Sequence, residues 1–143
     1  MLRISEAANL AIHAMAYLYS QQGDGYNAVA VIASGLGCSP SHLAKVLNHL
    51  VRHGMLESSR GAQGGFRLSP AFRNATALQV LEAIDGPFQE KGCLLGDPIC
   101  DMQSCIFGDL YQDMRQRLVD RFRMVKVGDI KLRSSSGKFP DSA

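Results

Sequence analysis

The sequence of 143 residues contains no apolar run that approaches the ~20 residues needed to span a lipid bilayer. Its N-terminal segment is apolar but is interrupted by Glu6, Asn9 and His13, and it lacks a basic start and a cleavage site for secretion. We therefore expect a cytoplasmic protein with no membrane partner. Because cytoplasmic thiols stay reduced, a cysteine cluster there indicates metal or redox chemistry more often than structural disulfides.

The sequence also lacks the signatures of a thiol-based redox enzyme. No Cys-x-x-Cys motif stands at a helix start, and no cysteine–histidine pair is evident. A small redox catalyst is therefore the weaker alternative, and we predict a protein that is not an enzyme.

Charge is distributed unevenly along the chain, although the formal net charge is only +2. Residues 39–73 sum to +4 and contain three histidines, residues 74–113 sum to −6, and residues 114–143 sum to +5. A basic segment of this kind is a candidate surface for binding phosphate. A solvated charged face would give the same pattern, so charge alone leaves both interpretations open.

Hydrophobic periodicity predicts a mainly helical protein with one small β-hairpin. Helices are expected over residues 5–21, 28–34, 39–53 and 76–84, with Ser5 and Ser39 at helix starts. Two alternating segments, "MLESSR" and "FRLSP", are joined by the glycine-rich "GAQGG" and predict the hairpin. A long last helix follows from an apolar stripe at i+3 or i+4, formed by Leu110, Met114, Leu118, Phe122 and Val125.

The apolar stripe of the last helix fits either a core helix or a dimer helix, and the small size of the preceding domain favours a dimer helix. The expected organisation is a DNA-binding domain over residues 1–87, a cysteine-rich loop over 88–109 and a dimerisation helix over 110–130. The polar residues 131–143 are expected to be a disordered tail.

A short helix, a glycine-containing turn, a longer helix and a hairpin follow one another in the order of a winged helix-turn-helix protein. The helix from Ser39 has the size to enter a major groove, and its side away from the core carries Ser39, Ser41, His42 and Lys45. Ser39 could equally serve only as a helix cap. His49 and His53 are expected to be merely exposed helix residues.

The hairpin tip is the most specific DNA-binding feature of the sequence. Arg60 and Arg67 flank the turn, and Gly64 and Gly65 would let its backbone approach a DNA strand closely. A hairpin that only joined two strands would not need this combination. A winged-helix module that binds another protein instead of DNA is the alternative.

Three of the four cysteines, Cys93, Cys100 and Cys105, stand in the segment "GCLLGDPICDMQSCIFGDL" with the spacing C-x6-C-x4-C. Intervals of this length on a loop would let three thiolates converge on one centre. Soft sulfur ligands select iron–sulfur clusters, zinc or copper(I), so the spacing alone leaves the metal open. Cys38 stands apart, and we expect it to be a small buried residue.

The segments "CSPSHLAKVLNHLVRHGMLESSRGAQGGFRLSP" and "TALQVLEAIDGP", followed by the cysteine loop, resemble the IscR/NsrR family of bacterial winged-helix regulators. The likeness extends from "LRISEAANLAIHAM" to the long helix near residue 127, and "SSRGAQGGFRL" resembles the wing motif of the family. The resemblance implies a homodimer with crossed long helices that binds palindromic DNA operators. In many members an iron–sulfur cluster reports iron, redox state or nitric oxide.

The resemblance also implies site residues. Ser39, Ser41, His42, Lys45 and Arg60 match the positions of the recognition helix and the wing. Ala44 stands where some members have a glutamate that discriminates bases, so operator preference does not carry over.

Three thiolates leave a cluster without its full set of ligands. Some family members have a histidine three residues after the third cysteine, where this sequence has Gly108. Others use the first helix of the partner subunit. By that resemblance Asn9 matches an aspartate or glutamate ligand and His13 matches a histidine ligand of a two-iron subgroup. Asn9 is a neutral amide and therefore the poorer candidate, while His13 is favoured over its alternative role as a hydrogen-bonded histidine near the core.

These observations together predict a transcription regulator whose affinity for its operator is controlled by an iron–sulfur cluster. The main alternative is a regulator of the same fold without a cluster, whose cysteines sense thiol oxidation or zinc.

Overall fold

The computed structural model describes residues 3–21, 23–97 and 99–133. Within these residues the chain forms five α-helices and one two-stranded antiparallel hairpin. The mainly helical winged helix-turn-helix fold expected from the sequence is confirmed. The elements are α1 (Glu6–Ser20), α2 (Val29–Leu36), α3 (Pro40–Arg52), β1 (Leu56–Ser59), β2 (Gly65–Leu68), α4 (Ala77–Asp85) and α5 (Leu110–Met124), with a short 3₁₀ turn at Val127–Asp129.

The helices begin where side chains can bond the free backbone N–H groups of a first turn. The Ser5 hydroxyl accepts from the N–H of Ala8, and Ser39 accepts from the N–H of His42. Thr76 and Gln79 form a reciprocal capping box at the start of α4. Helix α2 ends at Gly37, whose positive φ of 68° closes the turn before α3.

The start of α1 is also fixed from outside its own helix. Asp85, at the end of α4, accepts from the backbone N–H of Ser5 at 3.0 Å and from the Ser5 hydroxyl at 2.5 Å. A carboxylate at a helix N-terminus is favoured by the helix dipole. This pair therefore joins the first helix to α4.

The hydrophobic core lies where α1, α2, α3 and α4 meet. The expected inner face of α3 is confirmed, because Leu43, Val46, Leu47 and Leu50 are all buried. Met15 of α1, Ile32 of α2 and Val80 of α4 are fully buried against them. Val127, from beyond α5, joins the same core and is fully buried.

Helix α5 is shorter than the sequence pattern indicated. It ends at Met124 rather than near residue 130, and Val125 has extended backbone. The N–H of Ala77 donates to the carbonyl of Val125 at 2.7 Å, and the N–H of Val127 donates to Ala75 at 2.9 Å. Val125 stands three residues after Phe122, a spacing that also fits a helix. Periodicity therefore could not show that backbone bonds to Ala75 and Ala77 end the helix before it.

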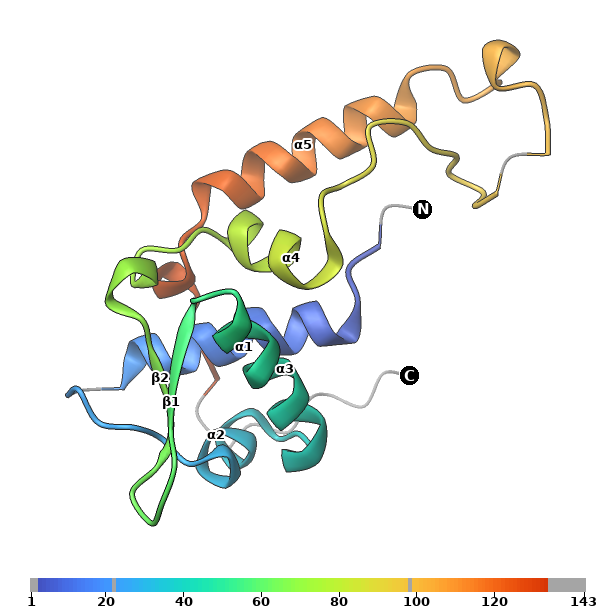
Figure 1. Cartoon of the computed structure of the whole chain (residues 1–143). Coiled ribbons are helices and arrows are strands. Elements are labelled where there is room, and N and C mark those ends of the chain that lie inside the picture. Colours follow the sequence, from blue (N-terminus) through green and yellow to red (C-terminus); the bar gives the residue numbers. More distant parts are fainter. Residues whose placement is uncertain (1–2, 22, 98, 134–143) are drawn as a thin grey trace.

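Helix α5 lies along α4 and buries part of its surface there (Figure 1). Tyr111 and Val119 are its buried residues, and Phe88 stacks against Phe122 with ring centroids 6.2 Å apart. Two residues of the expected stripe, Leu110 and Met114, are 45% and 41% exposed. The dimer contact thus remains a prediction, and an apolar surface is available for it.

The hairpin and the cysteine loop project from opposite ends of the molecule (Figure 1). The hairpin extends from the α1–α3 side, while the loop between α4 and α5 extends past the start of α5. Among the described residues, no helix is both long enough and apolar enough to span a membrane. The expected disordered tail falls largely on residues 134–143, which lie outside the described residues.

Candidate DNA-binding surface and cysteine loop

Helix α3 presents a polar face to solvent over its whole length. Ser41, His42 and Lys45 are exposed on the side opposite the buried leucines. The helix N-cap function of Ser39 is confirmed, and its hydroxyl also lies 3.0 Å from that of Ser41. A hydroxyl that already caps its own helix has less capacity left for a DNA base, so Ser41, His42 and Lys45 are the stronger candidates.

The hairpin places Arg60 at its exposed tip, directly after β1. Leu56 pairs with Leu68 at the base, and Ser59 pairs with Gly65 at the other end. Leu56 is buried in the core while Ser58 and Ser59 are exposed. The hairpin is therefore anchored at one end and reaches away from the body at the other.

The wing is also bonded to the segment between α1 and α2. The N–H of Asn27 donates to the carbonyl of Phe66, and the N–H of Phe66 donates to the carbonyl of Asn27, both at 2.8 Å. Asn27 thereby extends the hairpin by one bridge. Gly65, at φ 141°, permits this contact because a Cβ there would lie 2.1 Å from the Asn27 carbonyl oxygen.

The glycines of the wing thus have a structural role that the sequence did not reveal. A Cβ on Gly64 would lie 2.3 Å from the carbonyl oxygen of Ser59 within the turn itself. The close approach that Gly64 and Gly65 allow is to the backbone of the protein. A further approach to DNA at these residues stays a prediction.

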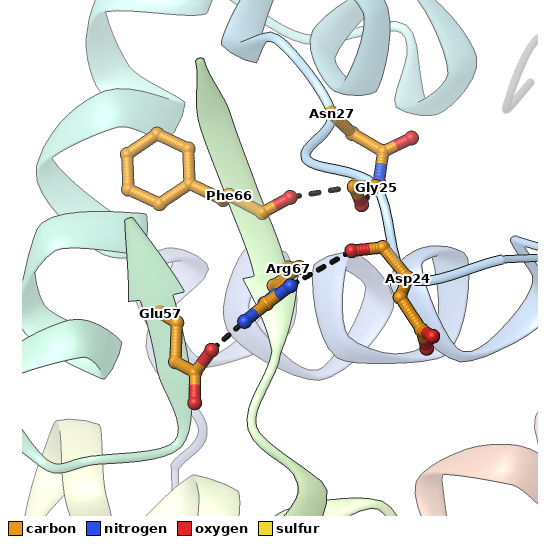
Figure 2. A network of polar contacts seen from close by, with 6 residues as sticks. All are labelled: Asp24, Gly25, Asn27, Glu57, Phe66 and Arg67. Carbon is orange, nitrogen blue, oxygen red and sulfur yellow. Dashed lines mark hydrogen bonds and ion pairs between the residues drawn. The ribbon is translucent and has the colours of Figure 1, made fainter. Parts of the chain in front are cut away.

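Arg67 is held at the base of the wing and not at its tip. Its Nε donates to Glu57 at 2.8 Å across the hairpin, and its Nη1 donates to the carbonyl of Asp24 at 2.9 Å (Figure 2). The guanidinium also lies 4.5 Å from the ring centroid of Tyr26. The hydrogen bond to Glu57 is the main cause that raises the pKa of Arg67. Arg67 therefore orients the wing, and a contact from it to DNA phosphate stays a prediction.

The cysteine loop is anchored at its start by side chains of α5. Tyr111 donates to the carbonyl of Gln89 at 3.3 Å, Gln112 donates to that of Glu90, and Arg115 donates to that of Phe88 at 3.2 Å. The Tyr111 ring also packs on Gly92, where a Cβ would lie 2.5 Å from the ring. These contacts fix residues 88–92 against α5.

The three loop cysteines differ in their surroundings. Cys93 is buried, Cys105 is half-buried, and both line one cavity of ≈ 380 Å³ together with Tyr111 and Phe107. Cys100 is exposed and does not line that cavity. The Cys93 sulfur accepts a hydrogen bond from the N–H of Leu95 at 3.4 Å.

The structure does not gather a complete set of metal ligands within one chain. Across residues 3–21, 23–97 and 99–133, no three side chains of the histidine, cysteine, aspartate or glutamate type come together as a metal site. The residues nonetheless fit a soft metal centre by their chemistry, since two free thiols already share a cavity and the third stands on the same loop.

His13 and Asn9 lie one turn apart on α1. The Nδ1 of His13 lies 2.7 Å from the backbone carbonyl of Asn9, and because a carbonyl only accepts, Nδ1 carries the proton. In the neutral imidazole the Nε2 then holds a lone pair. Among the described residues of one chain, these side chains and the loop cysteines do not gather into a metal site.

Cys38 lies in the turn between α2 and α3 and is half-buried against the core. Burial raises the pKa of its thiol, an effect only partly opposed by a hydrogen bond with backbone. A neutral, sheltered thiol agrees with the expected packing role.

Comparison with known protein families shows which family the chain belongs to. The Rrf2 model, described as an iron-dependent transcriptional regulator, matches residues 4–131. The chain belongs to the Rrf2 family of transcriptional regulators. The match spans α1, α3, the wing, the cysteine loop and α5, and it confirms the resemblance found in the sequence.

Individual relatives agree with this membership. The HTH-type transcriptional regulator IscR of Pectobacterium carotovorum subsp. carotovorum is 22% identical over 129 residues, which cover 90% of this chain and 79% of the relative. Relatives of this kind are transcriptional regulators, in agreement with a role other than catalysis.

Two solved structures share the fold of this Rrf2 protein. CymR, the global cysteine regulator of B. subtilis, superposes with a TM-score of 0.70 at 22% identity, covering 90% of this chain and 95% of CymR. T. potens IscR superposes with a TM-score of 0.69 at 20% identity, covering 90% and 85% of the two chains.

The sequence patterns did not indicate several residues that build the site. Asn27, Tyr26 and Asp24 hold the wing, but in the sequence they only stand between the helices expected over residues 5–21 and 28–34. Asp85 fixes α1 across eighty residues of sequence. Both kinds of contact join distant segments, and neither leaves a periodic signal.

Proposed function

We propose that this Rrf2 regulator binds a palindromic operator as a homodimer and that an iron–sulfur cluster, held by Cys93, Cys100 and Cys105, controls its affinity for DNA. The observation that carries the proposal is the presence of two free thiols, Cys93 and Cys105, at one cavity of a loop that stands away from the DNA-reading end. When bound, such a cluster supplies redox and ligand-exchange chemistry at its iron and sulfur atoms.

DNA reading is assigned to the exposed face of α3 and to the wing. Ser41, His42 and Lys45 would meet base edges and phosphates in the major groove, with Ser39 at the helix start. Arg60 would meet the adjacent backbone or minor groove from the tip of the hairpin. The exposure of these side chains and the anchored base of the wing support this assignment.

The homodimer is assigned to α5. The apolar side chains of Leu110, Met114 and Met124 are 45%, 41% and 77% exposed on this helix. A second copy of α5 would cover them, and a two-fold dimer would place two α3 helices on successive half-sites of a palindrome.

The remaining cluster ligand is assigned to α1 of the partner subunit. His13 has its Nδ1 proton bonded to a backbone carbonyl, which is the usual arrangement for a histidine that binds metal through Nε2. Asn9, one turn earlier and exposed, is the second candidate, with a neutral and therefore weaker oxygen donor.

Coupling between the loop and the reading heads would pass through α5. Tyr111, Gln112 and Arg115 tie the start of the loop to this helix, and α5 packs on α4. Reordering of residues 93–105 against the partner would therefore shift α5, and the spacing of the two α3 helices with it.

A cluster-free thiol or zinc sensor is the second candidate function. Its thiol form is favoured by Cys100, a free cysteine that is exposed to solvent. The similarity of fold to CymR, the global cysteine regulator of B. subtilis, is compatible with it.

Anaerobic isolation with quantification of iron, acid-labile sulfide and zinc tests the two candidates. We expect a brown protein with sulfide-to-iron charge-transfer absorption, and a changed spectrum in the His13→Ala variant. A colourless protein with stoichiometric zinc would overturn the cluster and leave the second candidate.

The DNA-binding assignment has its own test. Replacement of Arg60 with alanine should weaken binding to an operator selected from random DNA, with a reduced salt dependence because one phosphate contact is lost. Unchanged affinity would contradict the role given to the wing.

A further inference from the structure

Two histidines at the end of α3 face one another and have no part in the function proposed above. His49 and His53 are one helical turn apart, and their Nε2 atoms lie 3.1 Å from each other. Their rings are nearly parallel, with an interplanar angle of 6° and centroids 4.9 Å apart. The sequence predicted two merely exposed residues, but His49 is half-buried and only His53 is exposed.

The hydrogen bonds of this pair leave nitrogen lone pairs available. The Nε2 of His49 also lies 3.0 Å from the carbonyl oxygen of Ala83 on α4. The carbonyl only accepts, so in the tautomer in which His49 donates to it, the Nε2 of His53 is the acceptor facing the same atom. If His53 donates instead, the Nε2 of His49 is the acceptor. In either arrangement at least one of the facing nitrogens holds a lone pair.

The geometry points to a binding site for a divalent transition-metal ion of the Zn²⁺, Ni²⁺ or Cu²⁺ class, chelated by the Nε2 atoms of His49 and His53. Histidines at i and i+4 on one helix face bind zinc in this way in other settings. With metal–nitrogen bonds of ~2.0–2.1 Å, two ligands of one ion stand about 2.9 Å apart in octahedral geometry and about 3.3 Å apart in tetrahedral geometry. The observed 3.1 Å lies between these values.

Two adjustments would complete the site. The nearly parallel rings must rotate about χ2 so that both lone pairs converge on the ion. Because no third histidine, cysteine or acidic side chain joins this pair among the described residues, water would fill the other coordination positions. Neutral imidazole ligands select borderline transition metals over Mg²⁺ and Ca²⁺, which require oxygen.

Metal binding would break an existing hydrogen bond between α3 and α4. A His49 Nε2 bonded to metal cannot donate to Ala83, so the ion competes with a contact between α3 and α4. The site lies at the end of the reading helix away from its N-terminal turn, and it is independent of the cysteine loop.

Isothermal titration of the full chain with NiCl₂ tests the site, with Cys93, Cys100 and Cys105 all replaced by serine to remove competing thiols. We expect one Ni²⁺ per chain and no heat from MgCl₂. The H53A substitution should weaken Ni²⁺ binding at least tenfold, because His53 is exposed and its loss leaves the fold intact. H42A, on the same helix, should leave the affinity unchanged and is the matched control.

A second measurement uses the chain with its cysteines in place, in case the serine variant does not fold. Substoichiometric Ni²⁺ should broaden the ring-proton NMR signals of His49 and His53 before those of His42 and His13. Equal nickel affinity with and without H53A, or broadening that spares His49 and His53, would overturn the proposal.

Discussion

The wing and the cysteine loop project from opposite ends of one small protein and are held in opposite ways. The wing is bonded along its length, with two strands in register, two hydrogen bonds to Asn27 and the Arg67–Glu57 ion pair. In the described part of the loop, residues 93–108 form hydrogen bonds only with residues up to three positions away. Side chains of α5 bond to the segment before Cys93, at residues 88–90.

Under the function proposed above, the difference would correspond to a division of work, with DNA reading at one end and sensing at the other. A DNA-reading element gains specificity when its shape is set before binding, because less conformational entropy is lost on the operator. A sensing element needs two arrangements of similar free energy, and a segment with only local bonds can adopt them. The chain thus combines a preorganised wing with an adaptable loop.

The largest expected effect comes from loosening the wing. Gly65→Ala should destabilise the protein by about 1–3 kcal/mol, because a side chain at φ 141° is strained and its Cβ would collide with Asn27. The free energy of unfolding in urea measures this, and operator affinity should fall with it. Gly61→Ala is the control, since it has a φ of 102° and open space around the added Cβ. Equal losses in the two variants would show that the contact with Asn27 contributes nothing.

Next in size is the ordering of the loop on loading with the cluster. Hydrogen exchange of amides in residues 93–108 should slow at least tenfold after anaerobic reconstitution, equivalent to about 1.4 kcal/mol. Exchange in residues 56–68 should stay the same because the wing is already bonded. Protection that spreads equally over both ends would contradict the division between them.

A smaller effect is expected from the ion pair at the base of the wing. In a double-mutant cycle with Arg67→Met and Glu57→Gln, the coupling energy should be about 0.5 kcal/mol, since both side chains are partly exposed and screened. Urea unfolding of the four proteins gives this energy. A coupling near zero would leave the orientation of the wing to the bonds with Asn27 and to the contacts of Arg67 with Asp24 and Tyr26.

The smallest expected effect is a difference in thiol reactivity between the two ends. In metal-free protein, iodoacetamide should label exposed Cys100 first and Cys38 more slowly, because burial raises the Cys38 pKa and lowers its thiolate fraction. Because the folded protein holds the Cys38 proton more tightly than the unfolded chain does, this thiol contributes its full share to the free energy of unfolding below the pKa of an unfolded thiol. The contribution is lost as the pH rises through the pKa of Cys38 in the folded protein. Mass spectrometry of labelled peptides between pH 7 and pH 10 follows both sites. Faster labelling of Cys38 than of Cys100 would refute the sheltered thiol.

The sequence predicted the local elements well because their signals are local. Ser5 and Ser39 stand at helix starts, the apolar face of α3 repeats at helical spacing, and the glycines mark the turn of the wing. The exposed polar face of α3 could be predicted from the same periodicity, since residues opposite a buried stripe on a surface helix face solvent.

The missed features depend on contacts between distant segments. The contacts by which Arg67 orients the wing were missed because its partners Asp24 and Tyr26 lie some forty residues earlier, while its contact with DNA stays a prediction. The end of α5 was misplaced because Val125 fits the helical spacing while its backbone bonds to Ala77. A partner subunit cannot be seen in one chain, so the role of His13 stays a prediction.

The burial of Val127 has a consequence for the order in which the protein is made. The core beneath the reading helix includes this residue from beyond α5, and it is fully buried there. During synthesis the DNA-binding half leaves the ribosome first but cannot complete its core until residue 127 has followed. A nascent chain that stalled within α5 would therefore carry the wing and α3 over an incomplete core, and that core is completed only after the cysteine loop has been translated.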